Sequence, residues 1–140
     1  MKASLFAILA LAAFALAGCG DGENGELPPE SSEAKTAKHQ KITAGEAYRL
    51  MGDGEAFILL DVRTKEEFKE KRIDGAILIP EYEIRERAPE ELPDKDARIF
   101  VYCRSGRRSA LAATDLIDMG YLDVHDFGGI IDWPYETVGE

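Results

Sequence analysis

Short strand-like runs alternate along this chain with segments of helical pattern, and this alternation constrains the fold more than any other feature. The runs lie at residues 56–60, 76–79, 99–102 and 123–127, and the first three are continuously apolar. Continuous apolar runs suit strands that are buried on both faces of a sheet. Strands that alternate with helices form parallel sheets. The pattern therefore predicts an α/β domain whose parallel sheet is covered by helices on both faces.

The segments between the runs carry signals for helix starts and ends. Residues 43–46 and 64–67 each read Thr-x-x-Glu, the spacing of a capping box in which the two side chains accept hydrogen bonds from each other's backbone. The Gly-Asp-Gly segment at 52–54 ends the first of these helices. We expect further helical segments within 83–92 and at 109–119.

A cysteine stands where the third run gives way to a helix. Residues 103–109 read Cys-Arg-Ser-Gly-Arg-Arg-Ser. A helix N-terminus offers unpaired N–H groups and partial positive charge, and both favour a thiolate or a bound anion. The three arginines add full charges. We therefore predict that Cys103 is a nucleophile, because the alternative of a small buried core thiol does not account for the arginine cluster.

The first 40 residues have the pattern of an exported lipoprotein. A short positive segment precedes an apolar run at 5–16, which is too short to span a bilayer of ~30 Å. Residues 16–19, Leu-Ala-Gly-Cys, resemble a bacterial lipobox. We expect a signal peptide at 1–18 and a lipid on Cys19, and the alternative is an ordinary signal peptide with a chance cysteine. The polar composition of the rest of 19–40 predicts a flexible tether.

This organisation has consequences for location and for cysteine chemistry. Gly20 is not the aspartate associated with inner-membrane retention, so we expect the periplasmic face of the outer membrane in a host with two membranes, and otherwise the cell surface. With Cys19 lipidated, Cys103 is the only thiol left in the exported domain, and no internal disulfide can form. A solitary thiol in an oxidising compartment fits one that is kept for reactivity.

Residues 41–140 are enough for one domain with one core. The formal charge of the whole chain is −10, which disfavours nucleic acid as a partner and makes the arginine cluster a local positive exception. The sequence shows no repeats and no cluster of metal ligands, so we expect neither metal nor cofactor, and we expect a monomer. His125 on the last strand and His39 in the tether are interpreted as structural or exposed, and neither is needed as a catalytic base.

Three segments resemble signatures of the rhodanese-like sulfurtransferase family. The loop at 103–108 resembles its active-site loop. Residues 59–63 (Leu-Leu-Asp-Val-Arg), followed by 66–68 and 73–80, resemble its upstream signature, and 128–133 (Gly-Gly-Ile-Ile-Asp-Trp) resembles its C-terminal one. The likeness runs from about Lys41 to Val138. Lys71-Arg72 stands where family members often carry Gly-His, which concerns a local turn and not the chemistry.

The resemblance implies a fold and a reaction. The fold would be a central, mostly parallel five-stranded sheet with helices on both faces. The reaction would transfer a sulfane sulfur from thiosulfate or a related anionic donor to cyanide or a thiol, through a persulfide on Cys103. Such covalent catalysis proceeds in two half-reactions.

The resemblance also assigns roles around the thiolate. Backbone N–H groups of the loop would point at the sulfur, Arg108 would brace the loop, and Arg104 and Arg107 would attract the donor at the mouth. Asp61 is expected to pair with a loop arginine, and Arg63 to help at the rim. Gly128, Gly129 and Trp133 are assigned to packing. The complete predicted substrate-binding set is Arg104, Ser105, Gly106, Arg107, Arg108 and Ser109.

Two other functions remain open. Some proteins of this fold are phosphatases or arsenate reductases, whose loops resemble Cys-x5-Arg. Here Arg108 closes a Cys-x4-Arg loop and Ser109 occupies the phosphatase arginine's place, and a shorter loop should hold a single sulfur better than a tetrahedral phosphate. The other alternative is a membrane-anchored binding module or sulfur carrier with little turnover.

Overall fold

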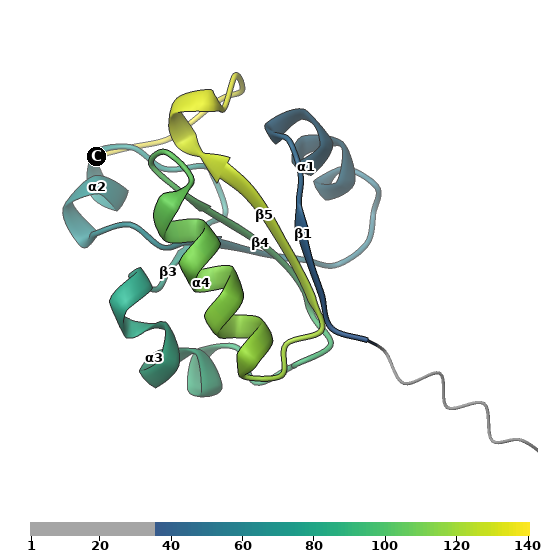
Figure 1. Ribbon diagram of the computed structural model, residues 1–140. Helices are drawn as coiled ribbons and strands as arrows, with labels where there is room; N and C mark the ends of the chain where they lie inside the picture. The colour runs from purple at the N-terminus through teal and green to yellow at the C-terminus, as the bar shows by residue number, and fades with distance from the viewer. Residues whose placement is uncertain (1–35) are drawn as a thin grey trace, which may run out of the picture. The chain divides into compact units, whose positions relative to one another are not determined.

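The computed structural model describes residues 36–140 (Figure 1). The predicted signal peptide, the lipid site at Cys19 and most of the predicted tether lie outside the described residues. Within residues 36–140, no helix combines the length and the apolar character that crossing a membrane requires.

The centre of the domain is a five-stranded parallel sheet, which confirms the predicted fold class. Its strands follow one another in space as β1-β5-β4-β2-β3, and every pairing between them is parallel. The strands are β1 (Lys38–Lys41), β2 (Ile58–Asp61), β3 (Ile77–Leu78), β4 (Arg98–Cys103) and β5 (Asp123–Gly129). The active-site candidates Asp61 and Cys103 are the last residues of β2 and β4, so they share the carboxyl edge of the sheet.

Strand β1 corrects the predicted end of the tether. The sequence placed residues 38–40, including His39, in the tether, but they form an edge strand paired with β5. All four residues of β1 are exposed, so no apolar pattern marked the strand. The register places Lys38 opposite Asp123 and Lys41 opposite Asp126.

The helices follow the predicted capping signals. Both Thr-x-x-Glu segments form complete capping boxes, and a helix begins after each threonine. The helix after β4 begins at Arg107, two residues earlier than predicted, because Gly106 precedes it with a φ of 100° and turns the chain directly into the first helical turn. The helices are α1 (Ala44–Met51), α2 (Lys65–Glu70), α3 (Ile84–Glu91) and α4 (Arg107–Asp118), with short 3-10 turns at Glu81–Glu83 and Ile130–Asp132.

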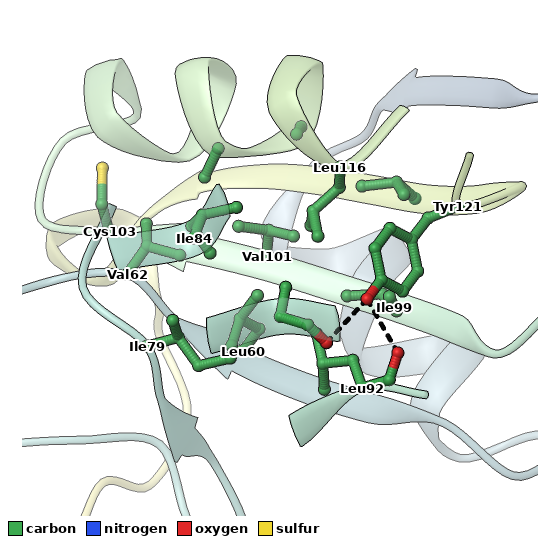
Figure 2. Packing of buried hydrophobic residues seen from close by; sticks show 14 residues of the cluster. Leu60, Val62, Ile79, Ile84, Leu92, Ile99, Val101, Cys103, Leu116 and Tyr121 are labelled. Atoms are coloured by element: carbon green, nitrogen blue, oxygen red, sulfur yellow. Dashed lines mark hydrogen bonds between the residues drawn. The ribbon is translucent and has the colours of Figure 1, made fainter. Parts of the chain in front are cut away.

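Side chains alternate between two hydrophobic clusters along β4, as expected for a strand covered on both faces. Ile99, Val101 and Cys103 belong to the cluster that includes residues of α3 and α4. Phe100 and Tyr102 belong to the cluster on the α1 side. Figure 1 shows α3 and α4 together, apart from α1. Figure 2 shows Cys103 at one end of the first cluster, beside the loop that joins β4 to α4. The sheet therefore holds the cysteine at the edge of a packed core.

Candidate active site

The loop after Cys103 is fixed by close contact with the glycine pair that ends β5. A Cβ atom on residue 129 would lie 2.2 Å from the carbonyl oxygen of Arg104 and 2.6 Å from the Cα of Ser105. The backbone N–H of Ile131 donates to the same Arg104 carbonyl at 3.3 Å. Gly129 is therefore more than the packing residue that the sequence indicated, because it lets the loop sit directly against β5.

The sulfur of Cys103 lies among hydrogen-bonding groups of its own loop. The N–H of Gly106 donates to Sγ at 3.0 Å, and Sγ lies 3.7 Å from the hydroxyl oxygen of the buried Ser109. That hydroxyl is 3.1 Å from the carbonyl oxygen of Gly106 and 3.3 Å from that of Gly128. The serine thus links the thiol to both sides of the loop.

These contacts explain the acidity of the thiol. Burial is the largest influence and raises the pKa of Cys103, but hydrogen bonds from the backbone and hydroxyl of Ser109, and from the N–H groups of Gly106 and Ser105, together outweigh it. The pKa of Cys103 is therefore below its ordinary value. From the sequence we also expected the arginine charges to lower this pKa. In the structure the hydrogen-bond donors of the loop are the main cause of the lowering.

The three loop arginines are in different environments. Arg104 and Arg107 are exposed. Arg108 is partly buried and binds the carboxylate of Glu67 with both terminal nitrogens, at 2.7 and 2.9 Å. Glu67 also accepts the N–H of Thr64 in the capping box of α2. Glu67 thereby joins the loop to the first turn of α2. The sequence indicated its role in the capping box but not its ion pair with Arg108.

The predicted partner of Asp61 is corrected by the structure. Asp61 binds Arg63, with its carboxylate 2.6 Å from a terminal guanidinium nitrogen, and does not pair with a loop arginine. The backbone N–H of Arg63 donates to the same carboxylate at 2.9 Å, so a tight turn brings the two residues together. Both side chains are buried, and Arg63 also donates to the carbonyl oxygen of Lys71. Arg63 is thus largely buried and is held in place by Asp61 and by the carbonyl of Lys71.

Two pockets are lined in part by residues of the loop that follows Cys103. One of about 370 Å³ is lined by Arg63, Glu67, Glu70, Lys71, Arg104, Ile130 and Ile131. Another of about 620 Å³ includes Ser105, Gly106 and Arg107 of the loop, together with Lys41 and the start of α1. Each pocket therefore combines loop residues with at least one cationic side chain.

The remaining candidates for metal binding or acid–base chemistry are the acidic side chains and the two histidines. Among residues 36–140, no group of three or more His, Cys, Asp or Glu side chains could hold a metal ion. His125 lies within β5 and stacks on Phe100, and His39 lies on β1. Neither histidine is among the groups that hydrogen-bond to the Cys103 sulfur.

Comparison with known proteins shows one consistent likeness. Residues 43–134 match the rhodanese-like domain family. The thiosulfate sulfurtransferase PspE of Escherichia coli (strain K12) is 41% identical over 73 residues, which cover 52% of this chain and 70% of PspE. A sulfurtransferase of Allochromatium vinosum is 38% identical over 84 residues, 59% of this chain and 77% of the relative. A solved rhodanese with anions from E. coli is 38% identical, with a TM-score of 0.57, and is covered completely by 61% of this chain.

Proposed function

Because this chain belongs to the rhodanese-like family, which includes sulfurtransferases, we propose that it transfers a sulfane sulfur through a persulfide on Cys103. The proposed donor is thiosulfate or a related anion, and the proposed acceptor is cyanide or a thiol. The observation that carries the proposal is the environment of the sulfur. A thiol with a lowered pKa, held by N–H and hydroxyl donors at the start of a helix, is suited to act as a nucleophile and to hold an added anionic sulfur.

The first half-reaction loads the cysteine. The Cys103 thiolate attacks the outer sulfur of thiosulfate, a new S–S bond forms, and the original S–S bond breaks with its electron pair leaving on sulfite. The product is a terminal persulfide anion on Cys103. We propose that the same loop donors also stabilise this anion, whose outer sulfur is bonded to the sulfur that they now contact.

The second half-reaction unloads it. Cyanide or a thiolate attacks the outer sulfur, the persulfide S–S bond breaks, and its electron pair returns to the Cys103 sulfur. With cyanide the product is thiocyanate, and with a thiolate it is a new persulfide. No separate base is needed for either attack when both nucleophiles are already deprotonated. Arg104 and Arg107, both exposed beside the loop, are proposed to attract the anionic donor.

The contacts of Arg108 support sulfur transfer over phosphate chemistry. The arginine that closes the loop is occupied by two hydrogen bonds to Glu67. A phosphatase needs such donors free to bind the oxygens of a phosphoryl group, since fixed positive charge is the main source of its catalysis. The short Cys-x4-Arg spacing agrees with this. The carrier function with little turnover differs only in rate and is decided by the second half-reaction.

For location and assembly, the proposal rests on the sequence. We propose that Cys19 carries a lipid that anchors a monomeric protein, at the periplasmic face of the outer membrane in a host with two membranes. The motif at 16–19 supports the lipid, and metabolic labelling with a fatty-acid analogue tests it. Labelling of the unaltered protein but not of Cys19→Ala is expected, and release of an unlabelled soluble form contradicts the anchor.

Intact-mass measurement tests the reaction directly. After incubation with thiosulfate, the protein should gain the mass of one sulfur atom, and Cys103→Ser should gain none. Addition of cyanide should remove the sulfur and release thiocyanate. A protein that takes no sulfur from thiosulfate or polysulfide contradicts the proposed function, and one that loads but does not unload is a carrier.

A further inference from the structure

The ion pair between Glu67 and Arg108 holds the carboxylate of Glu67, a residue of α2, against the first turn of α4, next to the loop that follows Cys103. Arg108 is the second residue of α4 and lies five residues after Cys103. Its two terminal nitrogens bind the two oxygens of Glu67, the strongest common geometry for such a pair. Each side chain is about a quarter exposed, at 27% and 26%, so solvent and small molecules can reach the pair.

Arg108 interacts mainly with the charge of Glu67 and more weakly with the negative charges of Cys103 and Asp61. Hydrogen bonds from Arg108 to Glu67 are the first cause of the raised pKa of Arg108, and the negative charges of Cys103 and Asp61 raise it further. The charge of Arg108 is therefore largely balanced by the Glu67 carboxylate that it binds. Of the three loop arginines, only Arg104 and Arg107 make no ion pair within residues 36–140.

Glu67 also lines the pocket beside the loop. In that pocket of about 370 Å³ Glu67 shares the lining with the charged residues Arg63, Glu70, Lys71 and Arg104 and with the exposed Ile131. An anion that enters there is attracted by Arg63, Lys71 and Arg104 and repelled by Glu67 and Glu70. The repulsion grows with the charge of the anion, because the Coulomb energy is proportional to it.

We propose that Glu67 is a specificity-determining residue, which disfavours doubly charged sulfur donors such as thiosulfate relative to singly charged donors of the thiosulfonate class. The inference rests on the proposed sulfur transfer and deepens it. A thiosulfonate reacts in the same way: the Cys103 thiolate attacks the outer sulfur, the S–S bond breaks, and the electron pair leaves on a sulfinate. The two donor classes therefore differ in charge while the bonds that form and break are the same.

Steady-state kinetics with two donors tests this inference. For thiosulfate and methanethiosulfonate, the measured quantity is the ratio of their kcat/KM values. In Glu67→Gln the ratio should rise in favour of thiosulfate by about five-fold, the effect of removing one charge at a distance of ~4 Å in a largely aqueous site. Glutamine can still accept the N–H of Thr64, so the capping box of α2 is retained.

Two further variants separate charge from structure. Glu66→Gln removes the same charge from the adjacent exposed position of α2 and should leave the ratio unchanged. Glu67→Asp keeps the charge but shortens the reach to Arg108, so both kcat/KM values should fall by a similar factor and the ratio should stay near that of the unaltered protein.

The outcomes distinguish the inference from the function on which it rests. If Glu67→Gln lowers both kcat/KM values equally, Glu67 only holds Arg108 in place, and the inference is wrong while sulfur transfer stands. An equal rise of the ratio in Glu66→Gln also overturns it, because the effect is then one of net charge. If the unaltered protein takes sulfur from neither donor, the proposed function fails and the inference fails with it.

Discussion

The carbonyl oxygen of Arg104 lies where a side chain on Gly129 would begin. The Cβ of an alanine there would be 2.2 Å from that oxygen, although the φ of −118° and ψ of 148° at Gly129 are ordinary for any residue. The requirement for glycine at this position is therefore one of space and not of backbone conformation. The pair of glycines that ends β5 and the loop that follows β4 are fitted to each other.

Gly129→Ala should displace the loop that follows Cys103. Overpacking of this kind costs about 1–3 kcal/mol of stability, and a shift of the loop donors by about 1 Å should lower kcat roughly 100-fold. Thermal unfolding and steady-state sulfur transfer measure the two effects. Gly54→Ala is the control, because Gly54 has a φ of 89° and no atom within 4 Å of the added Cβ, so it should lose stability but keep activity. Full activity in Gly129→Ala would contradict the fitted loop.

Ser109→Ala should raise the pKa of the Cys103 thiol. It removes the hydroxyl that lies 3.7 Å from the sulfur, and losing a donor to the thiolate disfavours the charged form. The rate of alkylation by iodoacetamide against pH should shift to higher pH, and kcat/KM should fall about ten-fold, as expected for one hydrogen bond to a charged group. Ser105→Ala is the control for the alkylation profile, since Ser105 acts through its backbone N–H, which alanine keeps. The same shift in both variants would refute the assignment.

Arg104→Ala should raise the KM for thiosulfate several-fold and leave kcat less affected. Arg104 is exposed and lines the pocket beside the loop, whereas the backbone donors to the sulfur do not depend on its side chain. The difference should shrink as salt is added, because exposed charges are screened beyond ~8 Å at physiological ionic strength. Arg85→Ala removes the same charge from α3, where Arg85 pairs with Asp115. An equal rise in KM for that control would show that only net charge matters.

The sequence was most informative where burial leaves a pattern. Strands β2 and β4 are buried on both faces and appear as apolar runs, and the two capping boxes mark the starts of α1 and α2. Strand β1 left no such signal because its residues are exposed and its stability comes from pairing with β5. A linker and an exposed edge strand have similar composition, so only the partner strand distinguishes them.

The site divides in the same way. Cys103 and its loop are contiguous, so the strand-to-helix setting and the arginines were visible together. The partner of Arg108 was not visible in the sequence, because Glu67 lies 41 residues earlier. The role of Glu67 in a capping box was also enough to explain why a glutamate stands at this position. Asp61 was assigned the wrong arginine. A carboxylate can pair with an arginine two residues away or with one across the fold, and only the turn between Asp61 and Arg63 decides between them.

The ion pair between Glu67 and Arg108 should make stability depend on pH in the acid range. Hydrogen bonding to Arg108 is the main reason that the pKa of Glu67 falls to about 2 from its ordinary value of 4.5. The folded state therefore binds fewer protons than the unfolded state between these values, and the contribution of Glu67 is complete above the ordinary value and is lost as the pH falls toward about 2. The pair is a quarter exposed and bidentate, so we expect it to contribute about 1 kcal/mol at most to the free energy of unfolding. The Tm of Glu67→Gln near neutral pH should therefore lie below that of the unaltered protein by no more than roughly 4–8 °C.

That difference should narrow steadily in thermal unfolding curves recorded at decreasing pH and should nearly vanish where Glu67 is protonated in both states. Other carboxylates also lose their charge over this range, so both proteins become less stable and the difference between them is the quantity that reports on Glu67. Glu66→Gln supplies the baseline, because it removes a charge from the same helix turn without touching Arg108. A Tm difference that is the same at every pH, or that Glu66→Gln reproduces, would show that the bond from Arg108 does not contribute to stability through the charge of Glu67.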